Sequence, residues 1–285
     1  MIEQGDEGQL ASLMNSPIKE FAFQIDHTDE NKVKDTQKLF KEKRDSYVVL
    51  RKEALIKQIK DPNRVLNTIL QNSQLYNSSL VSEETKEFLI ERCAEIIAHF
   101  EFGVNQAAEQ MMRISDQHED PNYIRRKIRY SWEEGKAFAY HKSFTIREGE
   151  TVSGIENNSI FLNLARVEQF IDETYAWFKI VGGANQSMLS SDVAFFAGLE
   201  EAAHWLLAET KQEKRDIWSY PIPDPNDPSA TYYYANSYEF RALVWKAYFE
   251  FKLGVNYGFK EKLQEARKLI REYEENNGIK GKKLL

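Results

Sequence analysis

The stretch from Val193 to Leu207, VAFFAGLEEAAHWLL, decides how the fold of this chain is interpreted. Its apolar residues recur at helical spacing, and Glu200, Glu201 and His204 interrupt them. His204 follows Glu200 by four residues and Glu201 by three. Residues at these spacings share one face of a helix. The sequence therefore predicts that carboxylates and an imidazole project together, which is how many metal sites begin.

The same three residues also fit a simpler interpretation, the solvated face of an amphipathic helix. Two features favour a buried polar set instead. The apolar residues continue nearly all the way around the helix, and small side chains flank the polar trio. These small residues are Ala197, Ala202, Ala203 and Ala208.

Glu239 is the candidate for a third ligand. It lies near the start of a helix expected over residues 237–253, on the far side of a proline-rich segment. A structural role is equally open, because Asn236 as N-cap with Glu239 three residues later approaches a capping box.

Three short motifs of the chain resemble the gluzincin group of zincin metallopeptidases. In that group an edge strand precedes an H-E-x-x-H helix, and a glutamate on a later helix is the third metal ligand. The segment Ser159–Asn163 resembles the edge strand, the run EEAAH (200–204) resembles the metal helix, and EFRA (239–242) resembles the start of the glutamate helix. The resemblance covers residues 140–255.

The resemblance implies that His204 and Glu239 bind the metal and that Glu201 is the general base. Glu200 stands where the first histidine ligand belongs. A site of Glu200, His204 and Glu239 would give the ion two anionic ligands instead of one. Oxygen ligands favour manganese, iron or magnesium over zinc. The implied cofactor is therefore a divalent ion, zinc or else manganese or iron.

Two functions follow from this resemblance. The first is a metal-dependent hydrolase, peptidase-like, with an altered metal site. The second is a non-catalytic zincin-like module that binds a peptide or protein. In either, Tyr232, Tyr233 and Tyr234 of the proline-rich segment are expected to contact the substrate or partner, since aromatic residues are enriched at binding hot spots. The alternative that these tyrosines belong to the core stays open.

A helical di-metal carboxylate protein is a further alternative. Glu95 and His99 on one helix would face Glu201 and His204 on another. Such proteins use E-x-x-H on two helices, and Glu95 and His99 are four residues apart rather than three. Apolar neighbours make His99 a better fit to a satisfied core histidine.

Composition restricts the partners and the compartment. A net charge of −7 argues against general binding to nucleic acid, although Arg125, Arg126, Lys127 and Arg129 form a local basic patch. Cys93 is the single cysteine, so an intrachain disulfide is excluded. No apolar run is long enough for a membrane span, and the first residues lack the features of a signal peptide. We expect a cytoplasmic protein with no membrane partner.

The expected fold class is α+β, mainly helical, with an N-terminal helical region over residues 1–121 and a zincin-like domain with a small sheet over residues 122–285. Periodicity and breakers predict helices over residues 35–60, 63–76, 82–114, 164–181, 192–211, 237–253 and 259–276, with Ser82 as an N-cap. They predict strands at 144–147, 151–154 and 159–163.

Overall fold

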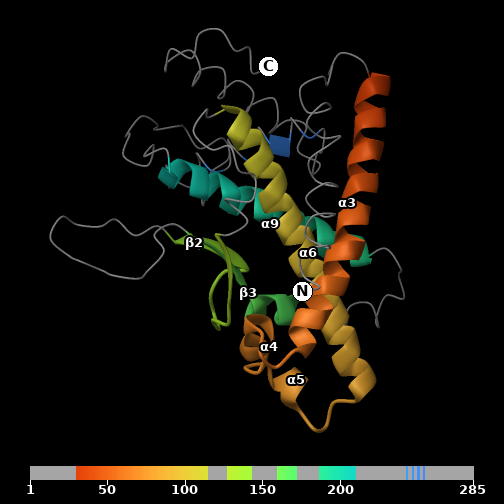
Figure 1. Cartoon of the computed structure of the whole chain (residues 1–285), viewed down its shortest axis with the longest axis vertical. Coiled ribbons are helices and arrows are strands. Elements are labelled where there is room, and N and C mark those ends of the chain that lie inside the picture. Colours follow the sequence, from red (N-terminus) through yellow and green to blue (C-terminus); the bar gives the residue numbers. More distant parts are fainter. Residues whose placement is uncertain are drawn as a thin grey trace, which may run out of the picture.

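The computed structural model describes residues 30–114, 127–142, 159–171 and 186–209, together with Ala242, Lys246, Phe249, Glu250 and Leu253. This part of the chain is mainly helical and carries one small sheet, so the predicted α+β, mainly helical class is confirmed (Figure 1). None of its helices is long and apolar enough to cross a membrane. The domain boundary at residues 121 and 122 and the strands predicted at 144–147 and 151–154 lie outside the described residues.

The two long helices expected from the N-terminal sequence are present. Helix α3 spans Glu30–Lys60 and helix α6 spans Glu83–Ile114, and the two pack along each other. Ser82 caps α6 as predicted, since its Oγ accepts a hydrogen bond from the Thr85 backbone N–H at 3.2 Å. The contact is aromatic at its centre, where the Phe102 ring lies 5.2 Å from Tyr47 and 5.6 Å from Phe40.

The single helix predicted over residues 63–76 is wrong. The structure has two short helices there, α4 (Val65–Leu70) and α5 (Gln74–Asn77). Ser73 causes the break, because its Oγ accepts a hydrogen bond from the Tyr76 backbone N–H at 2.9 Å and so begins a new helix. A cap inside a periodic pattern divided one expected helix into two.

The sheet has three strands, β1 (Ile128–Ser131), β2 (Ala139–Lys142) and β3 (Ser159–Asn163), in the order β1-β3-β2. β3 runs parallel to β1 and antiparallel to β2. The strand predicted at 159–163 is confirmed, but the interpretation of this segment as an edge strand is wrong. It is the central strand of this sheet, with its backbone paired on both sides. Its side chains Ile160 and Leu162 are fully buried, as suits a central position.

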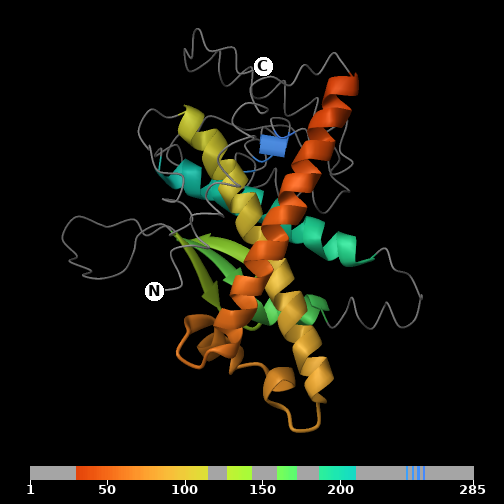
Figure 2. The same cartoon turned by 45° about the vertical axis from the view of Figure 1, so that its right-hand side comes forward.

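Helix α9 spans Gln186–Glu209, crosses α6 and carries the polar trio (Figures 1 and 2). Two glycines allow the crossing. A Cβ added to Gly103 would lie 2.2 Å from the Phe195 carbonyl oxygen, and one added to Gly198 would lie 2.3 Å from the Phe100 carbonyl oxygen. The two backbones therefore touch, and no side chain fits between them at this point.

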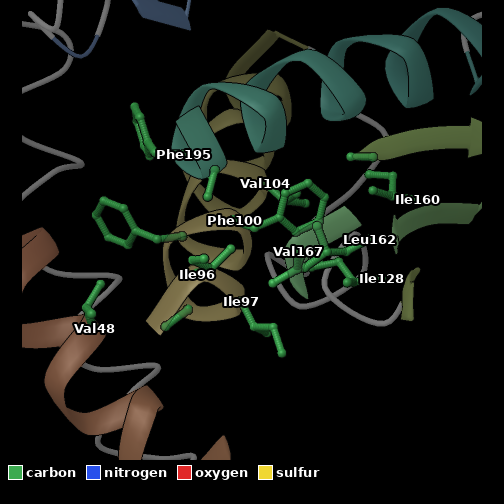
Figure 3. Packing of buried hydrophobic residues seen from close by; sticks show 14 of the residues in the cluster. Val48, Ile96, Ile97, Phe100, Val104, Ile128, Ile160, Leu162, Val167 and Phe195 are labelled. Atoms are coloured by element: carbon green, nitrogen blue, oxygen red, sulfur yellow. The ribbon is translucent and has the colours of Figure 1, made fainter. Parts of the chain in front are cut away.

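One continuous core joins the N-terminal helices to the sheet and α9. Phe195 of α9 lies 5.6 Å from Phe40 of α3 and 6.0 Å from Phe102 of α6, measured between ring centroids. Figure 3 shows Phe100 and Val104 of α6 on the side facing Ile160 and Leu162 of the sheet. The N-terminal helices therefore pack on the sheet and on α9, which come from the C-terminal half of the chain.

Candidate functional site

Helix α9 holds Glu201 and His204 inside the protein. Only 9% of Glu201 and 5% of His204 is exposed. They are buried because α9 packs on α6 and also contacts β2 and β3, and the neighbouring Ala202 and Ala203 bring these surfaces close. A solvated helix face is therefore the wrong interpretation for these two residues.

Glu200 forms an ion pair with Lys246. The Lys246 Nζ lies 2.8 Å from the Glu200 Oε2, and the two side chains are 17% and 19% exposed. Burial alone would lower the pKa of Lys246, but the charges of Glu200, Glu250 and Glu201 and the hydrogen bond to Glu200 outweigh it and raise the pKa. Lys246 is therefore an ammonium ion at neutral pH, and its charge neutralises Glu200.

Glu250 adds a third carboxyl to this cluster, four residues after Lys246. Only 6% of it is exposed. Burial raises the pKa of Glu250 to about 7, the charge of Lys246 opposes that rise, and the charge of Glu200 adds to it. This carboxyl therefore changes its charge near neutral pH.

A second imidazole reaches α9 from the sheet. The ring of His141 on β2 is parallel to the ring of His204, with 6.4 Å between centroids and 5° between planes. His141 was not among the site residues predicted from the sequence. The available signal was the Phe138–Lys142 segment after Gly135, a short aromatic run bounded by a turn residue, which is typical of a strand.

The donor atoms here are of the types that bind transition-metal ions, but the described residues supply too few of them at one point. Imidazole nitrogen and carboxylate oxygen together suit zinc and related ions, and His204, His141 and Glu201 supply them. Among the described residues, no three His, Cys, Asp or Glu side chains gather closely enough to hold an ion. Glu239, the third ligand expected from sequence, lies outside the described residues, as do Tyr232, Tyr233 and Tyr234.

The residues of the di-metal alternative have other contacts. Glu95 accepts a hydrogen bond from Arg92 at 2.8 Å, and the Nδ1 of His99 accepts one from the Arg44 Nε at 2.9 Å. Burial, helped by the positive charge of Arg44, lowers the pKa of His99 to about 3. His99 is thus the satisfied core histidine that the sequence favoured. Cys93, on the same helix, is buried, which raises its thiol pKa to about 12 and makes it unreactive.

A second buried polar cluster lies where α3, α6 and β1 meet. Arg51 donates two hydrogen bonds to the Glu101 carboxylate, from Nε at 2.6 Å and from a terminal nitrogen at 3.0 Å. The hydroxyls of Tyr130 and Tyr47 also donate to Glu101, the latter at 3.4 Å. One cation faces one carboxylate here, and hydroxyls complete the contacts. The charges of this cluster are matched and hydrogen-bonded, as in a structural polar network.

Comparison of the chain with protein-family models, with curated proteins and with solved structures gives no match. The residues of the α9 site are therefore the basis for proposing a function.

Proposed function

We propose that the protein is a metal-dependent hydrolase, peptidase-like, with an altered metal site. The observation that carries this proposal is the buried pair Glu201 and His204 on α9, with the imidazole of His141 parallel to that of His204 at 6.4 Å. Buried carboxylate and imidazole groups are costly unless they are hydrogen-bonded, paired or bound to a metal, and oxygen and nitrogen donors of these kinds suit a divalent ion.

The residues take distinct roles in this proposal. His204 and Glu239 would hold a divalent ion, zinc or else manganese or iron, which when bound supplies Lewis acidity. Glu201 is the general base that accepts a proton from water, since its spacing of three residues places it on the same face of α9 as His204. Tyr232, Tyr233 and Tyr234 would contact the peptide or protein substrate.

Metal analysis and a peptidase assay on the full-length protein test the proposal. We expect a divalent ion to bind, and Glu201→Gln to lower the hydrolysis rate by roughly 100-fold or more, as expected for loss of a general base. The variant should keep its metal content and its melting temperature. If the wild-type protein binds no divalent ion at micromolar concentration, the proposal fails.

One observation favours the non-catalytic binding module as a second candidate. The Lys246 ammonium stands among Glu200, Glu250 and Glu201 and supplies the positive charge that a metal ion would otherwise bring. Under this function the wild-type protein would bind its peptide or protein partner without metal. Lys246→Ala would then create an affinity for divalent ions that the wild-type protein lacks. Under the hydrolase function the wild-type protein already has that affinity.

A further inference from the structure

We propose that Arg44 of α3 is a positioning residue of the α9 site. It holds one end of α9, and α9 in turn places Glu201 and His204 at the other end. Arg44 thus acts through the helix and not by contact with these two residues. The inference rests on the proposed function in taking Glu201 and His204 as functional residues, but it requires no particular metal ligand.

Helix α9 is supported near its middle by its crossing with α6. The backbones touch where Gly103 of α6 meets Gly198 of α9. Interlocking side chains normally fix the angle at which two helices cross, but neither glycine has a side chain. The glycine contact therefore sets the distance between α6 and α9 at this point, and contacts away from it must set the angle between them.

Two arms of α9 extend from the crossing. The first arm, residues 186–197, passes α3, and the second, residues 199–209, lies against the sheet (Figure 2). Asp192 lies six residues before Gly198, and His204 lies six residues after it. At 1.5 Å per residue, each is about 9 Å from Gly198 along the helix. A rigid helix that turns about the crossing thus moves His204 as far as Asp192, in the opposite direction.

Arg44 holds the first arm in place. A terminal nitrogen of Arg44 lies 2.6 Å from the Asp192 Oδ1, and the Arg44 Nε donates to the His99 Nδ1 of α6 at 2.9 Å. The guanidinium also lies over the Phe195 ring, 5.0 Å from its centroid. His99 stays neutral around pH 7, because burial lowers its pKa to about 3, so its Nδ1 remains an acceptor. A planar guanidinium holds both partners in one geometry, and Arg44 therefore joins α3, α6 and α9 at one point.

The second arm carries its own reporter of position. The His204 ring is parallel to the His141 ring of β2, with 6.4 Å between centroids. When the contacts of Arg44 are lost, α9 can turn at the glycine crossing, and the separation of these two rings changes. A displacement of about 1 Å is enough to slow a catalysed reaction by up to 100-fold. Arg44 thus controls the geometry of the α9 site from a different helix.

Proton NMR of the histidine rings in the full-length protein tests the inference. The chain has five histidines, so each ring signal can be assigned by substituting that histidine. Arg44→Met keeps an unbranched side chain but removes both polar contacts. We expect it to shift the ring signals of His204 and His141, because each ring lies in the magnetic field of the other and that field changes steeply with distance.

Two further variants make this measurement specific. Asp192→Asn changes a side chain that is 36% exposed, so it should fold, and it should shift the same two signals in the same direction but by less. Lys52→Ala is the matched control. Lys52 also lies on α3 and pairs with Glu91 of α6 at 3.5 Å, but this pair does not involve α9. The control should leave both ring signals at their wild-type positions.

The peptidase assay gives a second measurement. Arg44→Met should lower kcat by roughly 10- to 100-fold and leave KM little changed, as expected when catalytic groups are displaced by about 1 Å. Wild-type ring signals in a folded Arg44→Met or Asp192→Asn protein would overturn the inference and leave the proposed function intact. So would equal shifts in Lys52→Ala. A wild-type protein that hydrolyses no peptide overturns the proposed function alone, because the ring signals report the position of α9 without any substrate.

Discussion

The Arg51 cluster and the α9 site are both buried and charged, but they differ in the balance between positive and negative side chains. In the Arg51 cluster one guanidinium faces one carboxylate, and the hydroxyls of Tyr47 and Tyr130 complete the contacts of Glu101. Among the described residues of the α9 site, the ammonium of Lys246 faces the carboxyls of three residues, and two imidazoles lie nearby. These three residues are Glu200, Glu201 and Glu250.

The two clusters share one property and differ in another. Burial is common to both clusters, so burial alone does not separate a structural network from a site. The balance of the described charges is the property that distinguishes these two clusters. A matched pair has no need of a further ion, whereas carboxyls in excess over cations favour a proton or a metal ion.

The largest effect is expected at the balanced cluster. Glu101→Ala leaves the Arg51 guanidinium buried without its carboxylate, and we expect the free energy of unfolding to fall by about 3–5 kcal/mol in urea denaturation. The double variant Arg51→Met with Glu101→Leu is the control and should recover most of this loss, because no buried charge remains. Equal losses in the two proteins would mean that the cluster acts through packing alone.

The next effect concerns the helix crossing that joins the two clusters. Gly198→Ala places a methyl group against the Phe100 carbonyl oxygen, which lies 2.3 Å from the built Cβ. We expect a loss of about 3 kcal/mol, since neither backbone can move without separating α6 from α9. Gly135→Ala is the control. Its surroundings are open, so only its φ of +73° costs stability, by about 1 kcal/mol. Similar losses at the two glycines would contradict a close crossing.

A smaller effect, dependent on pH, is expected at the unbalanced site. The pKa of Glu250 in the fold is about 7, above the ordinary value of 4.5. The folded protein therefore binds the proton more tightly than the unfolded chain, and this stabilisation is complete below pH 4.5 and is lost as the pH rises through 7.

Glu250→Gln removes that dependence. Between pH 5.5 and pH 8 the wild-type protein should lose about 2 kcal/mol more stability than the variant does. Urea denaturation at several pH values measures the difference. Parallel stability curves for the two proteins would show that Glu250 does not titrate in this range.

The smallest effect is expected at an exposed ion pair, which separates the influence of burial from that of distance. The Lys60 Nζ lies 2.6 Å from a Glu87 carboxylate oxygen, the same distance as the shorter contact between Arg51 and Glu101. The two side chains are 46% and 53% exposed, however. Lys60→Ala should therefore cost less than about 1 kcal/mol, and the cost should shrink further in high salt. A loss as large as that of Glu101→Ala would show that distance outweighs burial.

Local patterns in the sequence predicted the parts of the fold that local interactions determine. Helical periodicity gave α3 and α6, Ser82 gave the start of α6, and the buried run at 159–163 gave β3. β1 and β2 were missed because each has four residues and depends on β3 for its pairing. A partner so distant in sequence leaves no periodic signal in a strand this short.

The same limit applies to the candidate site. Glu200, Glu201 and His204 were visible because one helix carries them at spacings of three and four. Lys246, Glu250 and His141 were not, since each comes from another part of the chain and meets α9 only in the folded protein. Sequence alone therefore gave the residues of one helix but not their charge balance.

The order β1-β3-β2 has a consequence for how the chain assembles. β1 and β2 come first in the sequence, yet each pairs with β3 and not with the other. During synthesis both segments emerge before the strand that will join them. The sheet can therefore form only after the five residues Ser159–Asn163 have been synthesised. The position of His141 opposite α9 depends on the same strand, because β2 pairs only with β3 in this sheet.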